Sequence, residues 1–177
     1  GAVLSGTATV AAVAGVATFP GLSINRSGLG FTLGATSGTL TGATSTAFDI
    51  AVGMPAQLAF GVQPSNAQAG AAIAPALTVR IEDNQGNLTG STANVTVAIG
   101  TNPGPSVLTG TATVAAVAGV ATFSNLSLNK TGNGYTLGAT SGTLMGTTSA
   151  TFNISAGTAT QLVFVTEPTN TAAGASI

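Results

Sequence analysis

The residue types that carry out most enzyme chemistry are scarce in this sequence. Its 177 residues include no His, no Cys, four acidic and three basic side chains. General acid–base catalysis needs a group that titrates near the working pH, and a hydroxyl nucleophile needs a neighbouring base. The only adjacent carboxylates, Glu82 and Asp83, are consecutive on a predicted strand and so point to opposite faces. We therefore predict no catalytic residues, no cofactor and no enzymatic activity.

The segment Asp83–Asn87, with the sequence Asp-Asn-Gln-Gly-Asn, has two interpretations. Calcium loops combine Asp, Asn and a Gly turn, but they also need further carboxylates and a closing Glu, which this segment lacks. The same composition is typical of a tight turn between two strands. We interpret the segment as a turn and predict no metal site. Arg80 and Glu82, two residues apart on the outward face of the preceding strand, are expected to form a surface ion pair.

Six Asn residues match the N-x-Ser/Thr glycosylation pattern. Asn25 and Asn129 alone keep the pattern in two related segments of the chain, described below, and they are the candidate glycosylation sites. Each precedes a cation, Arg26 or Lys130. A ligand-binding role and a solubilising loop are both open for these two cations, and we favour the loop.

Charge and the length of the apolar stretches argue against a nucleic-acid partner and against a membrane span. Charged residues make up 4% of the sequence, against roughly 25% in an ordinary soluble domain. Three scattered cations do not form a surface that follows a phosphate backbone, so we predict no nucleic-acid partner. The longest apolar stretch, Val10–Ala17, is far shorter than the ~20 residues that a membrane span needs. We therefore predict no membrane span.

A long internal repeat organises the sequence. Residues 4–73 align without a gap to residues 108–177, an offset of 104, with 44 of the 70 pairs identical. Gly6–Phe19 recurs letter for letter as Gly110–Phe123. A period of about 100 residues matches one immunoglobulin-type β-sandwich and is too long for a solenoid unit. The phase predicts that residues 1–56 are the C-terminal part of one repeat, 57–159 a complete repeat, and 160–177 the first strand of the next. The chain is then expected to be a piece of a longer protein.

Within one period, apolar residues alternate in steps of two, as in half-buried strands, and no segment favours a helix. Pro64 interrupts the first of these runs, as Pro does at an edge or where a strand changes sheets. Tyr135 and the seven Phe lie on or near the inward alternation, so we expect them in the core instead of on a sugar-binding surface. The sequence predicts an all-β fold of tandem immunoglobulin-like sandwiches with about seven strands each. The expected inward face of one strand is Leu77, Val79 and Ile81, and the alternation places Leu58, Phe60 and Val62 together on one side of the strand before it.

Four motifs, in this order and spacing, resemble the bacterial immunoglobulin-like repeats of large surface proteins of the invasin and intimin type. They are Leu77–Asn87, the hairpin segment Ala118–Phe123, Gly134–Leu137 and Phe152–Ile154. The resemblance implies an extracellular or cell-surface location and a non-catalytic structural role in a stalk, filament or sheath. The alternative is an adhesive module for glycans or a partner protein. Because so few charges oppose contact between copies, we also expect the chain to associate with itself, laterally or end to end.

Overall fold

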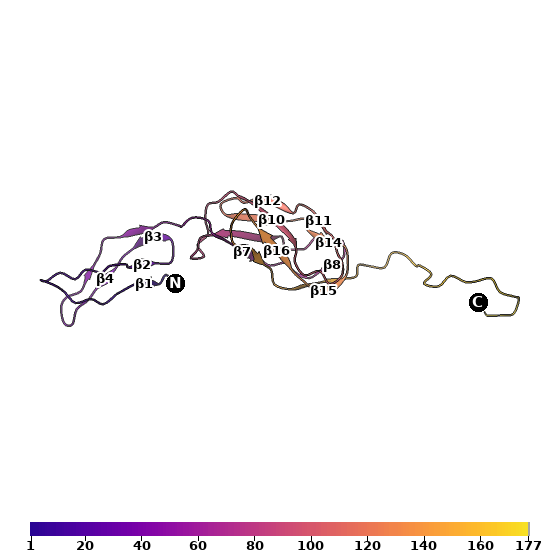
Figure 1. Cartoon of the computed structure of the whole chain (residues 1–177), viewed down its shortest axis with the longest axis horizontal. Coiled ribbons are helices and arrows are strands. Elements are labelled where there is room, and N and C mark those ends of the chain that lie inside the picture. The colour runs from indigo at the N-terminus through magenta and orange to yellow at the C-terminus, as the bar shows by residue number, and fades with distance from the viewer. Residues whose placement is uncertain (177) are drawn as a thin grey trace.

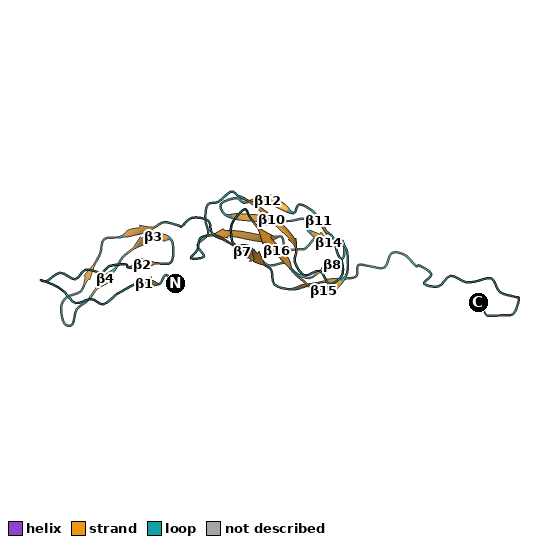
Figure 2. Ribbon diagram, viewed as in Figure 1, coloured by secondary structure: helices purple, strands orange, loops and turns teal. Residues whose placement is uncertain are grey.

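The structure is a computed structural model in which residues 1–176 are described. Every regular element in this range is a β-strand, so the all-β prediction is confirmed, and the architecture is of the sandwich class. No helix in the described part of the chain is long and apolar enough to cross a membrane. Figures 1 and 2 show three parts in a row: an open N-terminal segment, a compact domain and an extended C-terminal tail.

The compact domain contains twelve short strands between residues 57 and 155. They are β7 (Gln57–Val62), β8 (Ala67–Gln68), β9 (Leu77–Glu82), β10 (Asn94–Ile99), β11 (Leu108–Thr109), β12 (Thr113–Ala115), β13 (Val120–Phe123), β14 (Ser127–Leu128), β15 (Gly132–Tyr135), β16 (Leu137–Thr140), β17 (Thr147–Thr148) and β18 (Phe152–Ser155).

Two antiparallel sheets provide most of the domain. One has the order β13-β9-β7, and the other has the order β12-β10-β16-β17. β15-β18-β8 and β11-β14 form smaller sheets. In β10 the alternation is clean, because Val95 and Val97 are buried whereas Asn94, Thr96 and Ala98 are exposed. This is the pattern of a strand with one face on the core and the other in solvent.

The inward residues of these strands meet in one core. Leu77, Val79 and Ile81 of β9 are fully buried, as predicted. The ring of Tyr135 is also buried, 6.0 Å from the ring of Phe152, and its hydroxyl donates to the carbonyl oxygen of Lys130. The other buried apolar residues are Leu58, Ile73, Val95, Val97, Ala116, Ala121, Phe123, Leu126, Leu128, Leu137, Ala139 and Ile154.

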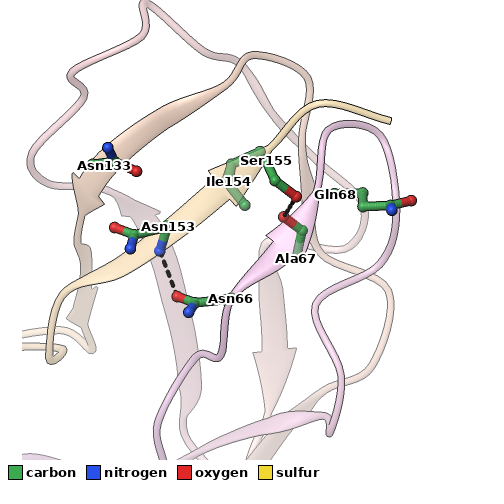
Figure 3. A pocket seen from close by; sticks show the side chains of 7 residues that line it. All are labelled: Asn66, Ala67, Gln68, Asn133, Asn153, Ile154 and Ser155. Carbon is green, nitrogen blue, oxygen red and sulfur yellow. Dashed lines mark hydrogen bonds between the residues drawn. The ribbon is translucent and has the colours of Figure 1, made fainter. Parts of the chain in front are cut away.

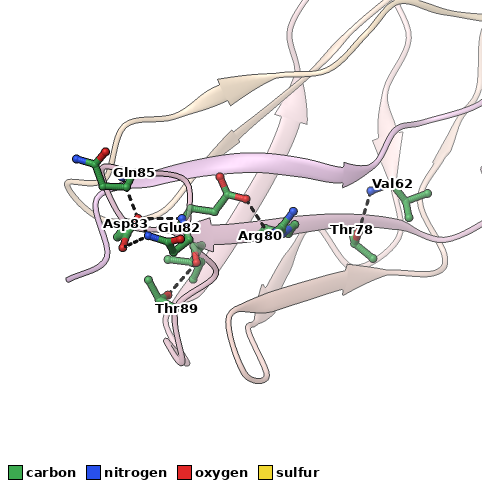
Figure 4. Close-up of polar contacts among 9 residues, drawn as sticks. Val62, Thr78, Arg80, Glu82, Asp83, Gln85 and Thr89 are labelled. Atoms are coloured by element: carbon green, nitrogen blue, oxygen red, sulfur yellow. Dashed lines mark hydrogen bonds and ion pairs between the residues drawn. The ribbon is translucent and has the colours of Figure 1, made fainter. Parts of the chain in front are cut away.

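The chain changes sheets at Pro64. Before it, β7 pairs antiparallel with β9, and after it, β8 pairs parallel with β18. The register of β7 shifts between Phe60 and Val62, where the N–H of Val62 donates to Oγ1 of Thr78 at 2.9 Å (Figure 4). A bulge bends a strand and increases its twist. The bulge and Pro64 together redirect the chain from one sheet to the other.

The predicted hairpin at Ala118–Gly119 is limited to its turn. Ala118 and Gly119 have φ of 47° and 81°, and the backbones of Val117 and Val120 exchange two hydrogen bonds of 2.9 and 3.0 Å. Positive φ at both central residues is the conformation of a type I′ turn. Beyond it, β12 pairs with β10 and β13 with β9, so the two strands separate into the two main sheets.

The N-terminal segment, residues 1–56, contains six short strands and not one buried residue. The strands are β1 (Leu4–Ser5), β2 (Ser23–Ile24), β3 (Gly28–Phe31), β4 (Gly34–Ala35), β5 (Ala43–Thr44) and β6 (Phe48–Ile50). They pair only among themselves, as β1-β2, β3-β6 and β4-β5. Residues 156–176 contain no strand, and Leu162 and Phe164 in this tail are exposed.

Candidate functional site

The most densely bonded polar site of the structure is the turn that follows β9. Oδ1 of Asp83 accepts the N–H groups of Gln85 and Asn87, both at 2.9 Å. The side-chain amide of Asn87 donates to both carboxylate oxygens, and the N–H of Asp83 donates to the carbonyl oxygen of Asn87 at 2.9 Å. Gly86 completes the turn with a φ of 80°, which favours glycine. The turn predicted from composition is therefore present, and Asp83 organises it (Figure 4).

The surroundings of Asp83 lower the pKa of its carboxyl group. Burial of this residue would by itself raise its pKa. Hydrogen bonds from the side chain and backbone of Asn87 and from the backbones of Gly53 and Gln85 outweigh that effect and lower the pKa from 3.8 to about 2. Asp83 is therefore ionised at every physiological pH. Its oxygens face N–H donors, an environment suited to an anion and unlike the ring of oxygen atoms that surrounds a calcium ion.

The same turn joins the compact domain to the residues before it. Oδ2 of Asp83 accepts the N–H of Gly53 at 2.9 Å, and the carbonyl oxygen of Glu82 accepts the N–H of Ala56 at 2.9 Å. Asn87 bonds to the N-terminal segment at two points: its Oδ1 accepts the N–H of Ser27, and its Nδ2 donates to the carbonyl oxygen of Asn25, both at 3.1 Å. We call this set of contacts the junction. It includes a hollow of about 190 Å³ lined by Gly53, Met54, Pro55, Ala56, Asp83, Asn84 and Gln85.

The exposure predicted for Glu82 is wrong. It was expected on the outward face of β9, yet this residue is buried. The turn folds back over it, so that Leu88 forms a bridge with Glu82 and Gly86 lies beside its carboxylate. The expected pair with Arg80 is present, with Nη2 and Oε1 3.2 Å apart and the Arg80 side chain 41% exposed. Because the Arg80 end of the pair is open to solvent, the pair contributes little, roughly 0.2–1 kcal/mol.

The structure places Asn25 and Asn129 in matching loops. Oδ1 of Asn25 accepts the N–H of Val3 at 2.8 Å, and Oδ1 of Asn129 accepts the N–H of Val107 at 2.9 Å. Both Asn residues are exposed, and no hydrogen bond within residues 1–176 uses their Nδ2 atoms, to which an N-linked glycan would be attached. Their modification stays a prediction.

The aromatic residues do not all lie in the core, contrary to the prediction. Tyr135, Phe123 and Phe152 are buried, whereas Phe19 is 40% exposed and Phe164 is 74% exposed. The reason is the absence of partner strands around these two residues in the structure, as the pairings of the N-terminal segment and the extended tail show.

A second hollow, of about 510 Å³, lies where β8, β15 and β18 meet (Figure 3). Amide side chains line much of it: Asn66, Gln68, Asn133 and Asn153. Oδ1 of Asn66 accepts the N–H of Asn153 at 2.7 Å, and Oδ1 of Asn153 accepts the N–H of Gly134 at 2.9 Å, so these two side chains are fixed. Such a surface can donate hydrogen bonds to, and accept them from, a neutral polar ligand.

Sequence reasoning missed both the junction and the amide-lined hollow. No cluster of three or more His, Cys, Asp or Glu side chains able to hold a metal occurs among residues 1–176. The junction depends on backbone N–H groups of Ser27, Gly53 and Ala56, which carry no side-chain signature.

In comparisons with known proteins, no family model matches the chain and no curated protein matches its sequence.

Proposed function

We propose that this chain is a piece of a tandem array of immunoglobulin-like repeats, and that it serves as a non-catalytic structural module of an extracellular stalk, filament or sheath. In this proposal the repeat unit is 104 residues long, and residues 57–159 form one complete unit. The resemblance to invasin- and intimin-like surface proteins belongs to the same proposal.

The observation that carries the proposal is the junction. Residues 1–56 precede the compact domain in the chain and are held to one end of it by the 83–87 turn and by the short segment from Gly53 to Ala56. Hydrogen bonds from two separate parts of the N-terminal segment restrict rotation between the two parts. Such joints suit a spacer, since they help to keep the array extended.

Strand pairing supports an immunoglobulin-like unit. The first strand region divides at Pro64 into β7, which pairs with β9, and β8, which pairs parallel with the last strand, β18. Two sheets over one core with a divided first strand are compatible with that class of sandwich.

Self-association belongs to the proposal as well. Large apolar side chains are exposed outside the compact domain, and the formal net charge is −1, so little repulsion opposes contact between copies. Since few charges take part, the extent of association should change little between low and high salt.

Hydrodynamics tests the structural role. A chain of three or more repeats should be elongated by small-angle scattering and negative-stain imaging, with a length that grows in equal steps per repeat. Sedimentation at low and high salt should show association of similar extent. A compact particle whose size does not grow stepwise would contradict the spacer role, and a strictly monomeric rod would contradict self-association.

The alternative role, an adhesive module, is favoured by the amide-lined hollow. Asn133 and Asn153 correspond at the 104-residue offset to Leu29 and Asp49, so this surface differs between the two copies, as a binding site would. Glycan-array binding that is lost in Asn133→Leu, with the domain still folded, would support adhesion. No binding to any glycan would favour the spacer.

A further inference from the structure

The domain has a second pole, at the end from which the C-terminal tail leaves (Figure 1). We define the distal pole as residues 129–131 together with residues 155–157. Its residues correspond at the 104-residue offset to the residues that the 83–87 turn holds in the junction: Asn129 to Asn25, Thr131 to Ser27, and Gly157 to Gly53.

The polar groups that the junction uses are unpaired at the distal pole. In the junction, the carbonyl oxygen of Asn25 and the N–H groups of Ser27 and Gly53 bond to Asn87 and Asp83. At the distal pole, no hydrogen bond within residues 1–176 reaches the carbonyl oxygen of Asn129 or the N–H groups of Thr131 and Gly157. All three residues are exposed.

The distal pole is already shaped for this contact. Asn129 is anchored through Oδ1 to the N–H of Val107 at 2.9 Å, as Asn25 is to the N–H of Val3 at 2.8 Å. In addition, Oγ of Ser106 accepts the N–H groups of Asn129 at 3.0 Å and Lys130 at 3.2 Å. A loop fixed before binding loses little conformational entropy on contact.

Charge also fits. Two of the three cations of the chain, Arg26 and Lys130, occupy corresponding positions in these two loops, and two of the four acids, Glu82 and Asp83, lie beside each other at the opposite pole. A cationic loop therefore faces an acidic turn wherever two units meet in the geometry of the junction. Complementary charges of this kind set orientation more than affinity.

We propose that the distal pole is a docking surface for the Asp-Asn-Gln-Gly-Asn turn of a following copy of the domain, with Asn129, Thr131 and Gly157 as its hydrogen-bonding contacts. This inference rests on the tandem-array function proposed above. It adds to that function a defined joint between neighbouring repeats. At each joint, the Asp and Asn side chains of one turn form the same hydrogen bonds as in the junction.

The test extends the full chain. Because Ile177 corresponds to Ile73, a second copy of residues 74–159 placed directly after Ile177 completes a further unit. Amide exchange is measured by NMR in the chain of 177 residues and in the extended chain. In the extended chain, exchange of the Thr131 and Gly157 N–H groups should slow by about tenfold, as expected for a new hydrogen bond. Asn87→Ala in the added copy should restore fast exchange at Thr131, while the N–H groups of Ser27 and Gly53 serve as the internal reference.

Two outcomes would overturn the docking surface. One is unchanged exchange at Thr131 and Gly157 beside a folded added copy. The other is an added copy that stays unfolded, since all but its first two strands repeat a folded domain and the pole would then fail to accommodate it. If the extended chain is elongated while these N–H groups stay unprotected, the defined joint is lost but the spacer function stands. Glycan binding through Asn133 would instead count against the spacer function alone.

Discussion

Two identical phenylalanines should differ sharply in what they contribute to stability. Phe19 and Phe123 end the same fourteen-residue sequence, yet Phe123 is 1% exposed in the core and Phe19 is 40% exposed. Phe123→Ala removes a fully enclosed ring and leaves a cavity, at a cost of about 3–5 kcal/mol. Phe19→Ala removes a ring from a segment without a single buried residue, so no enclosed cavity forms. We expect it to change the stability of the compact domain by less than about 0.5 kcal/mol.

The assay follows from the single tyrosine. The chain has one Tyr and no Trp, and Tyr135 is buried in the compact domain, so tyrosine fluorescence reports on that domain alone. In urea unfolding of the full chain, Phe123→Ala should lower the midpoint strongly, and in heating it should lower Tm by at least about 12 °C. If Phe123→Ala fails to fold, Phe123→Leu provides a milder version of the same comparison. Equal effects of the substitutions at the two positions would show that burial does not govern their contributions, and would refute the reasoning.

Three further outcomes are expected from the same assay. Asp83→Asn should destabilise the chain at neutral pH by about 2 kcal/mol, because it discards the benefit of a pKa lowered from 3.8 to about 2. That benefit is complete above pH 3.8 and disappears as pH falls toward 2, so the stabilities of wild type and variant should converge near pH 2. As a control, Glu167→Gln makes the same change of charge in the exposed tail and should have little effect on stability. Val79→Asp should unfold the domain by placing a charge at a fully buried site, whereas Thr122→Asp on the exposed face of β13 should be tolerated. Similar losses of stability in the two variants would mean that the inward and outward faces of these strands are misassigned. Ala118→Asn should raise Tm by a few degrees, since φ at this exposed position is 47° and Asn tolerates that region better than Ala, and an unchanged or lower Tm would contradict the turn geometry.

Local features of this protein follow from its sequence. The alternation of apolar residues predicted the buried set Leu77, Val79 and Ile81, and the absence of helix-forming segments predicted an all-β chain. The turn at Ala118–Gly119 recurs at Ala14–Gly15 with φ of 49° and 82°, and both turns are closed by a pair of valines. Such a turn depends on the conformational preferences of adjacent residues, so the same letters give the same turn in either setting.

The tertiary structure decided what happens beyond the turn. Gly110–Phe123 contributes β12 and β13, because β10 and β9 lie beside it and complete its hydrogen bonds. The identical Gly6–Phe19 forms no strand beyond its turn, since no partner strands flank it, and its phenylalanine stays exposed. The junction was equally beyond prediction, because it pairs the Asn87 side chain with backbone groups about sixty residues away in sequence. Whether a segment forms a strand and becomes buried depends on the strands beside it as well as on its own residues. Those strands come together only when the chain folds.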